Sequence, residues 1–151
     1  MQHAFESVLA GYLCAVAALK DDGSSFECLS LGKNGSTSEL LCSLSIKFSL
    51  DSANYELREV ALGIGCLPEA FTHWVAVRRR IMDETYSEEI EGRVLDRLAE
   101  EVRDFLGNRL SWFSLYRRAG APVEIRLGAI WDVFIVQSTE RAYAIHCSWD
   151  S

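Results

Sequence analysis

The chain has 151 residues, a length that fits one domain able to bury most of the surface that its unfolded form exposes. Hydrophobic residues make up 49% and charged residues 25%, with only 2 Pro and 10 Gly, which is globular composition and excludes a disordered or collagen-like chain. The formal net charge of -7 argues against binding to the nucleic-acid backbone and is compatible with a basic partner. We therefore expect one acidic domain over residues 1–151 that does not bind nucleic acid.

The cysteines indicate a reducing compartment. They are odd in number, lie in apolar surroundings and show no CxxC spacing, which is typical of reduced thiols in a cytoplasmic protein. The apolar stretch over residues 8–19 is long enough for the core of a signal peptide, but no Lys or Arg precedes it and it is too short to span a bilayer. We expect a cytoplasmic chain that begins at Met1 and has no membrane contact, with secretion as the alternative.

The first predicted helix covers the N-terminal residues and ends at the Asp-Asp-Gly of residues 21–23. Apolar residues recur there every three or four positions, at Phe5, Val8, Leu9, Tyr12, Leu13, Val16 and Leu19. The opposite face carries Ala, Gly and Cys. Small residues would let a second element approach closely, but they also have high helix propensity, and the propensity interpretation is preferred.

The next two segments predict a β-hairpin. Residues 26–31 are largely apolar, and the sequence GKNG at residues 32–35 is rich in residues that tolerate positive φ. Beyond this turn, apolar and polar residues alternate over residues 40–50, the pattern of a strand with one buried face. The alternating apolar positions are Leu40, Cys42, Leu44, Ile46, Phe48 and Leu50.

The middle of the chain favours helices. Residues 52–64 favour a helix, with a strand over residues 55–64 left open. Pro68 suits the first turn of another helix, although residues 74–81 also fit a strand.

A long amphipathic helix follows. Thr85 and Glu88 have the spacing of a capping box, and the helix runs to about Leu106 with Gly107 as its cap. A shorter helix is expected over residues 109–118.

The C-terminal stretch, residues 129–149, predicts two strands joined by a turn at residues 138–141, and a further strand over residues 123–127 leads into it. If Gln137 pairs with Ala142, one face carries a dense apolar surface, which we expect in the core. That face consists of Ile130, Asp132, Phe134, Val136, Tyr143, Ile145, Cys147 and Trp149. The other face, with Trp131, Val133 and Ile135, must also be covered by something.

Strands at both ends and helices between them predict an α+β fold. We expect one domain with an antiparallel sheet of about five strands, from the N-terminal hairpin and the C-terminal strands, packed with about four helices.

No group of residues in the sequence has a catalytic or metal-binding spacing. His3, His73 and His146 are the only histidines, and none stands at a zinc-ligand spacing from another His or Cys. His146 and Cys147 are neighbours on a strand, so their side chains point to opposite faces. We expect no catalytic residue, no metal and no cofactor.

An alternative interpretation is a small enzyme or ligand-binding domain with a pocket between sheet and helices. Asp132, His146, Arg78 and Arg80 would then supply the polar contacts. The arginines belong to a basic run inside residues 52–107, which hold 12 acidic and 7 basic residues. That surrounding charge favours intramolecular salt bridges.

Small size, acidity, lack of catalytic motifs and a Trp-bearing terminal hairpin, WDVFIV to AIHCSWD, give the chain a resemblance to bacterial toxin immunity proteins, which are compact single-domain chains that block a frequently basic toxin. The resemblance implies a protein that neutralises a partner by protein–protein contact, with electrostatic complementarity raising the association rate. A homodimer formed through the Trp131 face is a third hypothesis. The residues expected to face the toxin are Glu89, Asp96, Glu100, Asp104 and Trp131.

Overall fold

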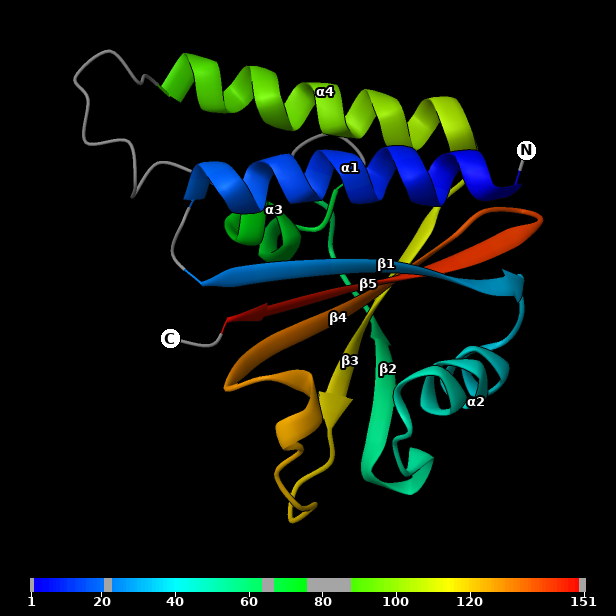
Figure 1. The fold of residues 1–151 in the computed structure, drawn as a ribbon. Helices are drawn as coiled ribbons and strands as arrows, with labels where there is room; N and C mark the ends of the chain where they lie inside the picture. The colour runs from blue at the N-terminus through cyan, green and yellow to red at the C-terminus, as the bar shows by residue number, and fades with distance from the viewer. Residues whose placement is uncertain (1, 21–22, 64–66, 76–87, 150–151) are drawn as a thin grey trace.

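The computed structural model describes residues 2–20, 23–63, 67–75 and 88–149. In chain order the elements are α1 (Gln2–Lys20), β1 (Ser24–Lys33), α2 (Thr37–Phe48), η1 (Ser52–Asn54), β2 (Tyr55–Glu59), α3 (Glu69–Val75), α4 (Glu88–Leu106), β3 (Ser111–Arg117), η2 (Ile125–Leu127), β4 (Ile130–Gln137) and β5 (Arg141–Trp149). The strands form one antiparallel sheet in the order β1-β5-β4-β3-β2. Over the described residues, four α-helices and this five-stranded sheet make the predicted α+β fold, with α1, α3 and α4 over one face and α2 on the other (Figure 1).

The terminal hairpin has the predicted register. Gln137 pairs with Ala142, and the ladder extends to Ile130 opposite Trp149. The Ser138 N–H donates to the Arg141 carbonyl at 2.8 Å and closes the turn. Because β5 and β4 have neighbours on both sides and their side chains alternate, they contribute to the core on each face of the sheet.

The core on the side of α1, α3 and α4, called here the helical-side core, contains most of the large buried side chains. The helices supply Leu9, Leu13, Val16, Phe71, Val75, Leu95, Leu98, Ala99 and Val102, and the sheet supplies Cys28, Trp112, Phe134, Val136, Tyr143, Ile145 and Cys147. The Phe71 ring lies 5.6 Å from that of Phe134 and 6.0 Å from that of Trp112, measured between centroids. These ring contacts attach α3 to the centre of the sheet.

The core on the opposite face, called here the far-side core, is covered by α2 and two loops. It contains Leu40, Leu44, Leu50, Tyr55, Phe113, Leu115, Leu127, Val133, Ile135, Ala142 and Ala144. The second apolar face of the terminal hairpin is therefore covered by the chain itself.

The predicted N-terminal hairpin is wrong, because residues 37–48 form helix α2. β1 is a strand as expected, but it pairs with β5. The Ser36 hydroxyl accepts from the Glu39 N–H at 3.2 Å and so caps the helix. Leu40 and Leu44, one helical turn apart, are buried, whereas Ile46 is 75% exposed. Leu40 and Leu44 fit the spacing of a helix as well as that of a strand, so the alternating pattern did not distinguish the two.

Two predictions in the C-terminal third are also wrong. Residues 109–118 contain strand β3 instead of a helix, and residues 123–127 contain the short helix η2 instead of a strand. Trp112 and Phe113 point to opposite cores, which a strand allows for adjacent residues. Aromatic residues favour strands when both faces of a sheet are covered.

In the middle of the chain, the strand alternative is right over residues 55–59, so the helix favoured over residues 52–64 is wrong there. The helix beginning near Pro68 is confirmed to Val75, and residues 76–81 and the Thr85 cap lie outside the described residues. α4 is confirmed, and its end is the expected Gly107, with φ +86° and its N–H donating to the Arg103 carbonyl at 2.8 Å. Among the described residues, no helix combines the length and the apolarity needed to cross a bilayer.

Candidate functional site

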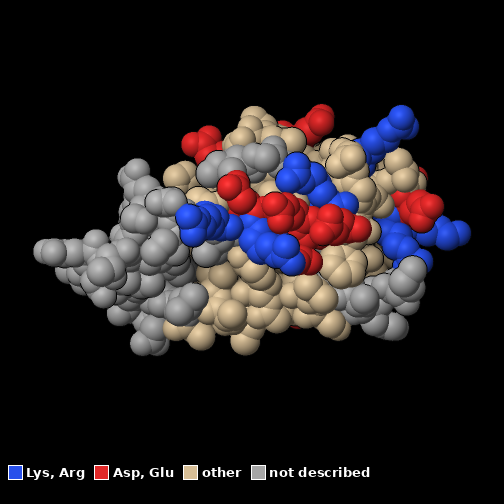
Figure 2. Space-filling model, turned by 90° about the horizontal axis from the view of Figure 1, so that it is seen from above, with Lys and Arg blue, Asp and Glu red and all other residues tan. Residues whose placement is uncertain are grey.

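Helix α4 presents a strongly charged outer surface. Its inner side buries Leu95, Leu98, Ala99 and Val102 against the sheet. Its sequence holds seven acidic residues against three arginines, a net charge of -4 out of -7 for the whole chain. Figure 2 shows Asp and Glu side chains mixed with Lys and Arg in one band across the top of the molecule, where α4 lies in Figure 1. The excess negative charge of the chain is thus concentrated on one helix.

Three of the predicted partner-facing acids lie together on α4. Asp96, Glu100 and Asp104 are exposed and follow one another at a spacing of four residues, which places them in one row. Like charges at this spacing destabilise a helix by about 0.2–0.5 kcal/mol per pair. Arg97 offsets part of the repulsion, because it pairs with Glu100 at 3.4 Å and with Glu101 at 2.6 Å. Within the described part of the chain, Asp96 and Asp104 form no ion pair.

The other two predicted residues are not part of this row. Glu89 lies in α4, but its side chain falls outside what the structure describes. Trp131 is on β4 and packs with the far-side core, its ring centroid 6.2 Å from that of Tyr55. The sheet therefore separates Trp131 from the acids of α4.

Asp132 lies on the helical side of β4, opposite Cys147 as predicted. Its Oδ2 accepts a hydrogen bond of 2.6 Å from the indole N–H of Trp74 in α3. Both side chains are half-buried, so the carboxylate has the partner that a partly desolvated charge requires. Its visible role is to hold α3 against the sheet.

His146 lies on the far side of the sheet. Its Nε2 is 2.7 Å from the Leu127 carbonyl, its Nδ1 is 3.9 Å from Glu27, and its ring packs edge-on against Phe48 at 5.3 Å. Asp132 and His146 therefore point to opposite faces and do not converge. Arg78 and Arg80, the remaining members of the predicted pocket, lie outside the described residues.

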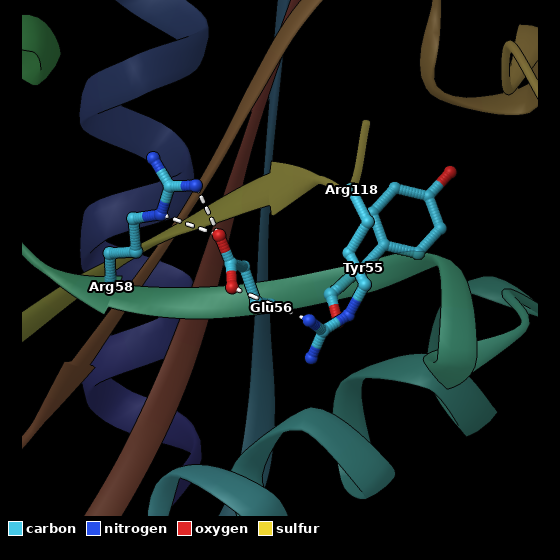
Figure 3. A network of polar contacts seen from close by, with 4 residues as sticks. All are labelled: Tyr55, Glu56, Arg58 and Arg118. Carbon is cyan, nitrogen blue, oxygen red and sulfur yellow. Dashed lines mark hydrogen bonds and ion pairs between the residues drawn. The ribbon is translucent and has the colours of Figure 1, made fainter. Parts of the chain in front are cut away.

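A polar network that the sequence did not indicate lies at the β2 edge of the sheet (Figure 3). The Glu56 carboxylate accepts from the Nε of Arg58 at 2.7 Å and lies 3.6 Å from Arg118, whose Nε donates to the Tyr55 carbonyl at 3.2 Å. The Arg58 guanidinium stacks over the Tyr116 ring at 4.3 Å. Because Glu56 pairs with both arginines, their guanidinium groups are already neutralised at this edge of the sheet and do not form an open anion site.

Next to this network, the Tyr55 phenol is buried in the far-side core. Burial raises the pKa of Tyr55, with Glu124 adding to the rise and Arg117 opposing it. No sequence motif could have found this arrangement, because its members come from strands about 60 residues apart, brought together by the β2–β3 pairing.

In the part of the chain that the structure describes, no three His, Cys, Asp or Glu side chains form a cluster that could hold a metal ion. The chain matches no protein-family model, no curated protein and no solved structure. The charged outer surface of α4 is therefore the candidate functional site, on the basis of its own geometry.

Proposed function

We propose that the chain is a binding protein that neutralises a basic protein partner, in the manner of bacterial toxin immunity proteins. The observation that supports this is the row of Asp96, Glu100 and Asp104 on the exposed side of α4. A helix that carries more than half of the net negative charge of its chain attracts a basic surface at long range. Such attraction raises association rates more than it raises affinity.

The row of acids destabilises the helix that carries it, and a binding role for the charges would explain this. Two like-charge pairs within the row oppose helix formation, and substitution of Glu100, which belongs to both pairs, by Gln would remove the repulsion without disturbing the core. A function that needs the charges explains why the row has all three. Asp132 and His146, by contrast, are already engaged in contacts within the fold.

The test is binding to a candidate basic toxin domain, chosen from the genes adjacent to that of this chain and measured on a biosensor at low and at high salt. We expect a complex whose association rate falls steeply as salt is added, because the charges on α4 are exposed. The variant Asp96→Asn/Glu100→Gln/Asp104→Asn should lower the association rate about tenfold and flatten the salt dependence.

The control variant removes the same number of acids away from α4, as Glu59→Gln/Glu124→Gln/Glu140→Gln. It removes the same three negative charges and should leave the salt dependence close to that of the parent chain. Absence of a complex, or a complex that responds equally to both variants, would contradict the proposal.

A further inference from the structure

The outermost side chains of α4 are segregated by charge along the helix. Arg93, Arg97, Glu100 and Asp104 are all exposed, and their spacing of four, three and four residues places them in one stripe. This stripe lies on the side of the helix opposite the buried Leu98. Its N-terminal half is basic and its C-terminal half is acidic.

This order of charges is complementary to itself. In an antiparallel pair of identical helices with a twofold axis between residues 98 and 99, Arg93 faces the partner's Asp104 and Arg97 faces the partner's Glu100. Symmetry makes four such contacts, and in two of them Arg97 and Glu100, which also pair with each other within one helix at 3.4 Å, meet the opposite charge of the second copy. Helix stability does not explain the order, because the dipole favours acids near the N-terminus and an acid preceding a base is the better pair within a helix.

Helix α1 carries a matching stripe without charge. Ser7, Gly11, Cys14 and Ala18 have the same spacing, and all are exposed. No residue between positions 7 and 18 is charged. A Cβ added at Gly11 would meet no atom within 4 Å, so this side of α1 is open. Small side chains allow two helix axes to approach at the short end of the usual 8–10 Å range.

The centres of the two stripes lie at one level of the helix layer. α1 and α4 run antiparallel side by side (Figure 1). Burial raises the pKa of Tyr12, and among nearby charges Arg97 lowers it and Glu101 raises it. The two helices contact each other, and Tyr12 packs against the core that contains Leu98, so the middle of α1 lies near the middle of α4. A single twofold axis perpendicular to both helices can therefore relate both stripes to their copies.

We propose that the outer surface of α1 and α4 binds a second copy of the chain. In this twofold-symmetric dimer, each α4 lies antiparallel to the partner's α4 and each α1 antiparallel to the partner's α1, as a four-helix bundle. Figure 2 looks onto this surface, where uncharged atoms lie beside the charged band. The dimer does not rest on the proposed function, but Glu100 and Asp104 belong to both surfaces. A basic partner and a second copy would therefore exclude each other.

The size of the surface sets the expected strength. Each helix has 19 residues, a length of about 28 Å, and two neighbouring helices give a patch of roughly 560 Å² per protomer. Stable complexes bury about 800 Å² per partner. We therefore expect a weak dimer that forms at high concentration and dissociates in salt.

Sedimentation velocity over a wide concentration range tests the proposal. We expect the parent chain to shift from monomer to dimer as concentration rises. Arg93→Glu/Arg97→Glu leaves four acids on each stripe, and Glu100→Arg/Asp104→Arg leaves four arginines. Each variant alone should lose at least about tenfold in dimer affinity, because like charges then face each other. An equimolar mixture of the two should form a heterodimer at least as tight as the parent dimer.

Two further variants separate this surface from a general charge effect. Gly11→Glu places a charge in open space on α1, so the fold should be retained while the dimer is lost. Arg109→Glu/Arg117→Glu reverses two exposed arginines outside the two helices and should leave the dimer unchanged. Circular dichroism would verify folding of each variant. A monomer at every concentration, a dimer insensitive to Gly11→Glu, or a mixture that fails to associate would overturn the proposal.

Discussion

The two faces of the sheet are covered in different ways. On the helical side, α1, α3 and α4 together bury aromatic side chains such as Trp112, Phe134 and Tyr143. On the far side, the 12-residue helix α2 is the single α-helix among the described residues. Solvent is excluded from the centre of both faces, since Ile145 on one and Ile135 on the other are fully buried.

The far side depends more on polar contacts at its margins. Ser36 caps the start of α2, and the Arg126 guanidinium donates to the Ser49 carbonyl at its end at 2.9 Å. Asn34 reaches the terminal hairpin by donating its side-chain amide to the Thr139 carbonyl at 2.7 Å. Apolar burial from several elements therefore covers one face, whereas one short α-helix with polar contacts at its ends covers much of the other.

Truncation of one buried isoleucine on each face should give the largest difference in stability between the two faces. Ile145→Ala opens a cavity under three helices, which cannot all move to fill it, and should lower the free energy of unfolding by about 3–5 kcal/mol. Ile135 lies beside Ala142 and Ala144 and under one helix that can shift to fill a cavity. We therefore expect Ile135→Ala to lower the free energy of unfolding by about 2–3 kcal/mol. Urea unfolding monitored by circular dichroism measures both. An Ile135→Ala loss equal to or greater than that of Ile145→Ala would contradict the difference between the faces.

The polar attachment of α3 gives a smaller effect. Asp132→Ala removes the acceptor of the Trp74 indole N–H, and the free energy of unfolding should fall by about 1.5 kcal/mol, the low end of the range for a hydrogen bond to a charged group, because both side chains are half-buried. Asp104→Asn is the control, because this exposed acid should change stability by less than about 0.5 kcal/mol. A red shift of Trp74 fluorescence in the Asp132 variant would show that α3 loosens. Equal stability of the two variants would mean that the bond contributes nothing.

The sequence predicted the terminal hairpin to the residue, because its register depends on a local turn and on alternation over both strands. Gln137 opposite Ala142 follows directly from these two signals. The segment over residues 40–50 was mistaken because its apolar positions fit both periods. The informative signal was the Ser36 and Glu39 pair, a capping box that starts a helix. At residues 109–118, where a helix was predicted, the adjacent Trp112 and Phe113 indicate instead a strand covered on both faces.

The candidate site was only partly accessible from the sequence. The row of Asp96, Glu100 and Asp104 follows from helical spacing alone, and in the structure all three residues are exposed on α4. Trp131 could not be placed, because the face of the sheet that α4 covers depends on long-range packing. That the stripes on α1 and α4 match could not be inferred from the sequence for the same reason. Residues near positions 12 and 98 become neighbours only when both helices lie on one face of the sheet.

The smallest predicted effect is a gain in stability on the far side, from a substitution at the end of α2. Ser49 ends α2 in the left-handed conformation, with φ 55° and ψ 44°, which disfavours any residue with a Cβ by about 1–2 kcal/mol. Ser49→Gly removes this strain and, after the greater entropy loss of glycine, should raise the free energy of unfolding by about 0.5–1 kcal/mol. Ser43→Gly, the same change inside α2, should lower it by about 0.5–1 kcal/mol. Hydrogen exchange should show the gain at the α2 amides. If Ser49→Gly slows exchange equally in α4, then α2 unfolds with the whole domain and the two faces are not stabilised separately.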